Sequence, residues 1–93
     1  MAVTILIPTA LRQFTDNLSE VEVGNSNTVN QALEVLSTKY DDLKIHLFTE
    51  EGTLRSFVNV YIGEEDIRQL NGVDTALIGD ETLILVPSIA GGV

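Results

Sequence analysis

The stretch Thr82–Pro87 has the sequence TLILVP, and it decides the fold predicted for this chain. Its apolar residues run on without the polar alternation of a half-exposed strand, which is typical of a strand in the middle of a sheet. The first predicted strand, Val3–Pro8 (VTILIP), has the same character. We therefore expect these two strands, from opposite ends of the chain, to be parallel central neighbours in a mixed sheet.

One clear helix is predicted between these strands, over Thr28–Tyr40 (TVNQALEVLSTKY). Thr28 is suited to cap its first turn, and Gln31 three residues later completes a capping-box pattern. Apolar side chains recur at helical spacing along one face. These side chains are Val29, Ala32, Leu33, Leu36 and Tyr40.

Two further strands alternate polar and apolar residues: Leu18–Val23 (LSEVEV), expected at an edge, and Arg55–Gly63 (RSFVNVYIG). The segment 63–66 predicts a turn, Ile67–Leu70 a brief return strand, and Asp41–Phe48 a short helical turn. The resulting order is β-β-α-β-(β)-β. It indicates an α+β domain over residues 1–87, with one main helix on one face of a four- or five-stranded mixed sheet. This is the β-grasp layout, and residues 88–93 are expected to form a flexible C-terminal tail.

Composition limits the function classes. The 93 residues fit one domain, and 44% hydrophobic with 20% charged residues is typical of a globular protein. A formal net charge of −9 argues against nucleic acid or an anionic membrane as a partner. It favours a basic protein partner, although the same charge would also serve solubility alone. No apolar run is long enough to span a membrane and no signal peptide is evident, so a cytoplasmic protein is expected.

No side-chain pattern for catalysis is present. The chain contains no Cys, and its one histidine, His46, has no nucleophile or carboxylate at a catalytic spacing. The acidic groups fall in predicted turns without the spacing of a calcium loop or another metal site. We therefore expect a structural role for His46, no metal, and a protein that is not an enzyme.

One face of the predicted sheet is unusual. Because side chains alternate along a strand, Leu83 and Leu85 should face the helix, which leaves the residues between them on the opposite face. A sheet face without a helix should be polar, yet several large apolar residues share it, and such a patch often marks a partner site. The alternative is that central strands tolerate apolar residues on both faces. The candidate partner-binding residues are Phe57, Tyr61, Ile84 and Val86, with Leu6 beside them.

The sequence VPSIAGGV, residues 86–93, begins at the end of the strand Thr82–Pro87 and suggests a chemical role for the chain end. Gly91 and Gly92 have no side chains, so the backbone there can thread a narrow channel toward a reacting centre. A carboxylate on such an arm can attack the α-phosphate of ATP held by a partner enzyme. Sulfur attack on the resulting acyl-adenylate would leave a C-terminal thiocarboxylate, with positioning supplied by the enzyme.

The segment Phe57–Gly92 resembles the C-terminal half of the ThiS/MoaD sulfur-carrier family of ubiquitin-like β-grasp proteins. It is most similar to the CysO branch, with its F-V-N-x-Y-x-x-x-E-D-x-R segment, D-T-x-L-x-x-G-D-x-x bend and P-x-x-A-G-G ending. The opening VTILIPTALRQFT and the helix TVNQALEVL match as well, so the resemblance spans nearly the whole chain.

The resemblance implies a function. Gly92 would be adenylated by a ubiquitin-activating-type enzyme that uses ATP, and Gly91 would form the narrow approach, with no cofactor bound to the carrier. Ile89 and Ala90 would contact the partner. CysO-like carriers give sulfur to a cysteine synthase, and a JAMM-type metallopeptidase releases the product.

Val93 departs from this pattern, because a β-branched side chain follows the reacting glycine. We therefore expect a JAMM-type peptidase to remove Val93 before activation. Two alternatives of the same class are the small subunit of molybdopterin synthase, bound to its large subunit, and a sulfur carrier for the thiazole of thiamin. Alternatives of other classes are a ubiquitin-like modifier joined to lysines through Gly92, and an interaction domain with an inert tail.

Overall fold

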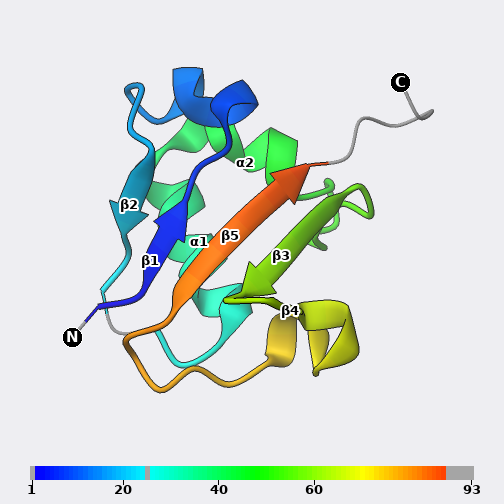
Figure 1. The fold of residues 1–93 in the computed structure, drawn as a ribbon. Helices are drawn as coiled ribbons and strands as arrows, with labels where there is room; N and C mark the ends of the chain where they lie inside the picture. The colour runs from blue at the N-terminus through cyan, green and yellow to red at the C-terminus, as the bar shows by residue number, and fades with distance from the viewer. Residues whose placement is uncertain (1, 25, 88–93) are drawn as a thin grey trace.

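The sheet has five strands in the order β2-β1-β5-β3-β4, with helices against one of its faces (Figure 1). It is described here from a computed structural model that covers residues 2–24 and 26–87. The strands are β1 (Thr4–Leu6), β2 (Glu20–Glu22), β3 (Val58–Ile62), β4 (Glu65–Asp66) and β5 (Thr82–Pro87).

Strand β5 is the centre of the sheet, as its apolar sequence predicts. It runs parallel to β1, with Leu83 beside Ile5, and antiparallel to β3, with Leu85 beside Val60. Figure 1 shows β5 crossing the middle of the molecule between these two neighbours. The predicted parallel pair of first and last strands is confirmed, and β2 is the predicted edge strand.

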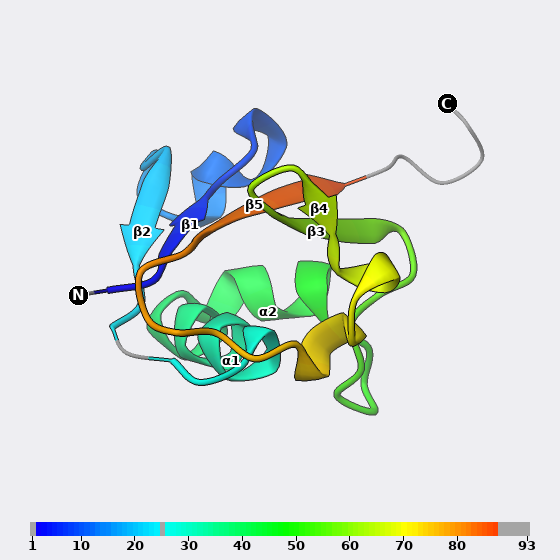
Figure 2. The same cartoon turned by 60° about the horizontal axis from the view of Figure 1, so that its bottom comes forward.

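Helices α1 (Val29–Lys39) and α2 (Asp41–Leu47) both lie under the same face of the sheet (Figure 2). The predicted cap is present, because Thr28 Oγ1 accepts a hydrogen bond from the Gln31 N–H at 3.1 Å. The Gln31 side chain returns a bond to the N–H of Asn27 at 2.6 Å, one residue earlier than in a standard capping box.

The core fills the space between the sheet and the helices. Leu83 and Leu85, which were predicted to face the helix, are buried there, and so are Val58 and Val60 of β3. Full burial of one such side chain stabilises the fold by roughly 1.5–3 kcal/mol. The other fully buried large side chains are Val3, Ile5, Ile7, Val29, Leu33, Leu36, Leu43 and Leu47.

One local prediction is wrong, and another is confirmed with a longer helix than expected. Residues Ile67–Leu70 do not form the return strand, because β4 comes earlier, at Glu65–Asp66, and Ile67–Gln69 is a 3-10 helix. The apolar Ile67 is buried because this short helix turns its side chain into the core. The segment Asp41–Phe48 forms a two-turn helix rather than a single turn, since Leu43 and Leu47 both enter the core at helical spacing.

Several predictions fall outside the described residues. They concern Ile89, Ala90, Gly91, Gly92 and Val93, and the division of the chain after residue 87 likewise stays a prediction. Over residues 2–24 and 26–87, no helix has the length and apolar character needed to cross a membrane.

Candidate functional site

The face of the sheet opposite the helices is uncovered by any element of the described chain (Figure 2). The strand register sets one residue from every strand in a single row across this face. The row runs Glu20, Leu6, Ile84, Tyr61 and Asp66. Apolar and aromatic side chains thus occupy its middle, and a carboxylate stands at each end.

Three of the predicted partner-binding residues, Tyr61, Ile84 and Val86, share this face through the register of β3 and β5. Ile84 and Tyr61 are half-buried cross-strand neighbours, and Val86, which is 39% exposed, lies beside Asn59. Phe57, in the turn just before β3, is 37% exposed. We call Leu6, Phe57, Tyr61, Ile84 and Val86 the open-face patch.

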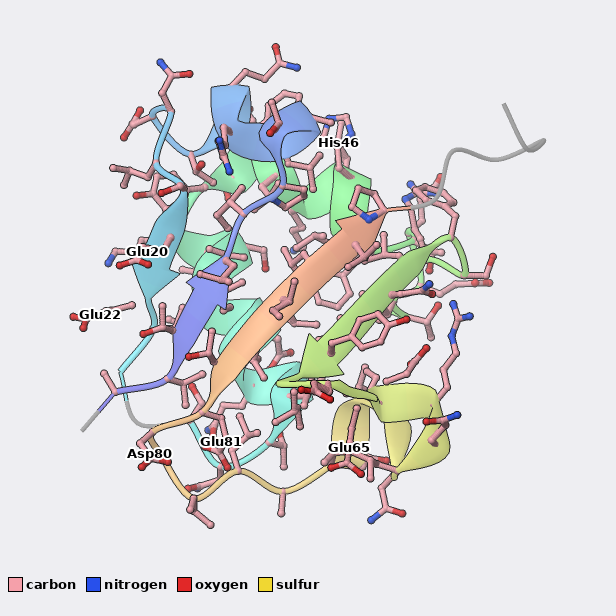
Figure 3. The ribbon with its side chains drawn as sticks, in the orientation of Figure 1. Glu20, Glu22, His46, Glu65, Asp80 and Glu81 are labelled. Atoms are coloured by element: carbon pink, nitrogen blue, oxygen red, sulfur yellow. The ribbon has the colours of Figure 1, made fainter. Side chains whose placement is uncertain are left out.

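Acidic side chains form the margins of this patch. Glu20 and Glu22 project from β2 along one edge of the sheet (Figure 3), and Asp66 stands on β4 at the other edge. An apolar centre with charged margins is the usual anatomy of a protein–protein interface. A surface complementary to this patch would have an apolar centre and basic margins, and opposite charge would speed encounter between the two.

The patch extends to the end of β5. Pro87, the last residue of this strand, lies beside Val58 at the start of β3, and Val86 precedes it on the open face. Residues 88–93 follow directly in the sequence. A partner seated on the open-face patch is therefore next to the point where the chain continues toward Gly92.

Two arginines fix the segment just before β3, which lies next to the end of β5. Arg68 donates from Nη2 to the Ser56 carbonyl at 2.6 Å, and Arg55 donates from Nε to the Ile45 carbonyl at 2.8 Å. Asp66 Oδ1 in turn accepts from the Arg68 N–H at 2.9 Å. The E-D-x-R motif is thus explained structurally, since its acid and arginine tie β4 to the segment before β3.

The D-T-x-L motif is also structural. Thr75 Oγ1 accepts from the Asn71 N–H at 3.0 Å and donates to the Gly72 carbonyl at 2.7 Å. The N–H of Leu77 donates to the Asn27 carbonyl at 2.8 Å. The two Thr75 bonds close the loop before β5 on itself, and the Leu77 bond fastens this loop to the segment that leads into α1.

A carboxylate closes the turn from which β5 begins. Glu81 accepts hydrogen bonds from the N–H groups of Ile78, Gly79 and Asp80 at 2.7, 2.9 and 3.2 Å. Slight burial of the Glu81 carboxyl raises its pKa, but these N–H groups and its own lower it more. Its net pKa lies below the ordinary value of 4.5. Figure 3 shows Glu81 and Asp80 at the start of β5, away from the strand's C-terminal end.

His46 has the structural surroundings expected of it. Its ring stacks on that of Phe14, with ring centres 4.3 Å apart and planes 27° from parallel. In the described part of the chain, no group of three or more His, Cys, Asp or Glu side chains is placed to hold a metal ion.

Sequence reasoning missed the two acids that close the row. Asp66 was assigned to a turn with Glu64 and Glu65, and the position of Glu20 opposite Leu6 depends on strand register. The one local indication for Glu20 is the alternation along Leu18–Val23. This alternation predicts that the acidic side chains of the strand point away from the core.

Comparison with known proteins identifies the family. Residues 5–92 match the model of the ThiS family. The chain belongs to the ThiS family. The sulfur carrier protein CysO of Mycobacterium tuberculosis is 32% identical over 94 residues, covering 99% of this chain and all of its own. A chain in the crystal structure of the Amycolatopsis orientalis BexX/CysO complex is 35% identical, with a TM-score of 0.85 over 98% of this chain and all of that one.

A third relative is named as a modifier rather than as a sulfur carrier. Small archaeal modifier protein 3 of Haloferax volcanii is 33% identical over 70 residues, which are 75% of each chain. The fold of the chain is thus the ubiquitin-like β-grasp predicted from sequence. Its relatives are named as carriers or modifiers rather than as enzymes.

Proposed function

We propose that this ThiS-family chain is a sulfur carrier that works through a thiocarboxylate at Gly92 and supplies sulfur for cysteine biosynthesis. The observation that carries the proposal is the position of the open-face patch. It surrounds the end of β5, directly before residues 88–93 with their two glycines. The full-length similarity to proteins named sulfur carrier protein CysO supports the same pathway.

The proposed chemistry begins with hydrolysis of the Gly92–Val93 peptide bond by a JAMM-type metallopeptidase. One oxygen of the Gly92 carboxylate then attacks the α-phosphorus of ATP on a ubiquitin-activating-type enzyme, and pyrophosphate leaves. Sulfide attacks the acyl-adenylate carbonyl, AMP leaves with that oxygen, and a proton is released. The product is a thiocarboxylate, and no oxidant or reductant is consumed.

The folded body has a separate task in this scheme. The open-face patch binds first the adenylating enzyme and then the sulfur acceptor, a cysteine synthase. Each partner takes up the glycines, whose missing side chains let the backbone approach a reacting atom closely. Positioning of this kind supplies a large part of the rate in enzymatic group transfer. We expect the carrier to act in the cytoplasm.

Intact-mass measurement tests the tail chemistry. Two forms of the chain, one ending at Gly92 and one at Val93, are incubated with ATP, the adenylating enzyme and sulfide. We expect sulfur to replace oxygen only in the form that ends at Gly92. The Val93 form should become competent after treatment with the peptidase. Sulfur on the form that retains Val93 would contradict the trimming step.

The acceptor is tested by affinity capture from cell extract on the thiocarboxylate form. A cysteine synthase should dominate the captured protein. A molybdopterin synthase large subunit or a thiazole synthase in its place would assign the chain to one of those pathways and overturn the cysteine assignment.

Similarity to small archaeal modifier protein 3 favours one further candidate function, conjugation to lysines of other proteins through Gly92. Higher-mass conjugates in cell extract that disappear when Gly92 is deleted would support this function. Their absence, together with thiocarboxylate formation, would leave the sulfur-carrier function alone.

A further inference from the structure

The outer edge of β2, which borders the open-face patch, is a second candidate binding surface. In the β1–β2 ladder the N–H of Val23 donates to the Val3 carbonyl at 2.9 Å. Inward- and outward-directed backbone groups alternate along an antiparallel edge strand. The N–H and C=O groups of Glu20 and Glu22 are therefore directed away from β1, toward the open edge of the sheet (Figure 1).

A groove runs along this edge, between the end of β2 and helix α1. It is an open hollow with a volume of about 460 Å³. Val23 and Gly24 line one side, and Glu34, Val35 and Thr38 of α1 line the other. Val35 is 39% exposed although it is a large apolar residue on a helix that packs against the sheet.

We propose that this edge binds an extended segment of a partner protein as a sixth strand, with basic and apolar residues in alternation. Backbone hydrogen bonds to Glu20 and Glu22 would hold the segment, as in other cases of strand addition. Its side chains must then alternate between the two faces of the sheet. The side chains on the open face lie beside the Glu20 and Glu22 carboxylates, so they are basic. The side chains on the other face enter the groove over Val35, so they are apolar.

Charge argues against a second copy of this chain as the occupant. Pairing of two β2 edges would bring Glu20 and Glu22 of one copy beside the same residues of the other, and like charges directly opposite are destabilising. The formal charge of −9 on each copy adds long-range repulsion. Charged side chains on an edge strand guard against such self-pairing, yet the same carboxylates attract a basic strand.

A short capped peptide of alternating valine and lysine is the probe. It is titrated into the full chain while amide chemical shifts and hydrogen exchange are recorded. We expect shifts at Glu20, Glu22 and Val35, and slowing of amide exchange at Glu20 and Glu22 by about tenfold or more at saturation. Shifts centred on Ile84 and Tyr61 instead would place binding on the open-face patch and overturn the proposal.

Two variants probe the two faces of the added strand. Glu20→Lys with Glu22→Lys should weaken the lysine peptide by at least about tenfold and create binding of a valine–glutamate peptide. Val35→Ser should weaken the lysine peptide by about threefold to tenfold. Unchanged affinity in either variant would contradict the proposal.

Ile78→Ser is the matched control for Val35→Ser, because Ile78 is 90% exposed and lies in the loop before β5. It should leave peptide affinity unchanged, and an equal loss in both variants would indicate a nonspecific apolar effect. Val35→Ser should also leave sulfur loading at Gly92 unchanged. Concentration-dependent shifts at Glu20 and Glu22 without peptide would identify a second copy as the occupant and overturn the proposal.

Discussion

The two faces of β5 differ in what covers them. Leu83 and Leu85 point toward the helices and are buried, whereas Ile84 is half-buried and Val86 is 39% exposed on the opposite face. All four residues are aliphatic, so composition alone does not separate them. The surroundings of the strand distinguish them, because helices cover one face and nothing in the described chain covers the other (Figure 2). The inner residues therefore stabilise the fold, and the outer residues are available to a partner.

The largest expected effect on stability comes from shortening a buried side chain on the inner face of β5. Leu83→Ala removes a fully buried side chain and leaves a cavity, so the free energy of unfolding should fall by about 3 kcal/mol. Ile84→Ala, one residue later on the outer face, should cost about 1 kcal/mol, because this side chain is already partly in water. Urea unfolding of both variants measures the difference. Equal losses would refute the division of β5 into a stabilising face and a docking face.

The second prediction concerns the outer face alone. Val86→Asp places a charge in the exposed part of the open-face patch and should lower kcat/KM for adenylation by about tenfold or more, with little change in stability. Pyrophosphate release measures the rate. Ile78→Asp adds the same charge at a more exposed site in the loop before β5. If both variants lose activity equally, the cause is added negative charge rather than loss of the patch.

The central strands of the sheet could be predicted from sequence, whereas the position of β4 could not. The continuous apolar pattern of Thr82–Pro87 and Val3–Pro8 indicated central strands, and their parallel pairing followed from chain order. The return strand was misplaced because Ile67 is apolar and Glu65 and Asp66 are acidic. Hydrogen bonding to β3, not hydropathy, decides which of these residues form β4.

The candidate site was predictable in part for the same physical reason. Alternation along β3 and β5 is a local property, so Tyr61, Ile84 and Val86 could be assigned to one face from sequence. The row that joins Glu20 to Asp66 depends on register between strands far apart in the chain. No local pattern encodes that register. The predictions for residues 88–93 lie outside the described chain and remain to be tested at Gly92.

The smallest expected effect concerns the turn that keeps the two faces of β5 distinct. A slip of β5 by one residue would exchange Leu83 and Ile84 between the faces. Glu81 opposes such a slip, because its carboxylate binds three N–H groups of the preceding turn. Its folded-state pKa is lowered, so its contribution to stability is present above the unfolded-state pKa and is lost as pH falls through the folded-state pKa.

Glu81→Gln should therefore lower the free energy of unfolding at neutral pH. It should also make that free energy fall less steeply as pH decreases from about 4.5. The effect should stay under about 1 kcal/mol, since the carboxylate is largely exposed and solvent screens it. The chain has thirteen other Asp and Glu side chains, so the measurement is the difference between the unfolding free energies of the two proteins across pH. Asp80→Asn is the charge control, because it removes the same charge from the adjacent residue while the three hydrogen bonds to Glu81 stay in place. A difference curve that is the same for both variants would mean that net charge, rather than the hydrogen-bonded turn, accounts for the acid sensitivity of β5.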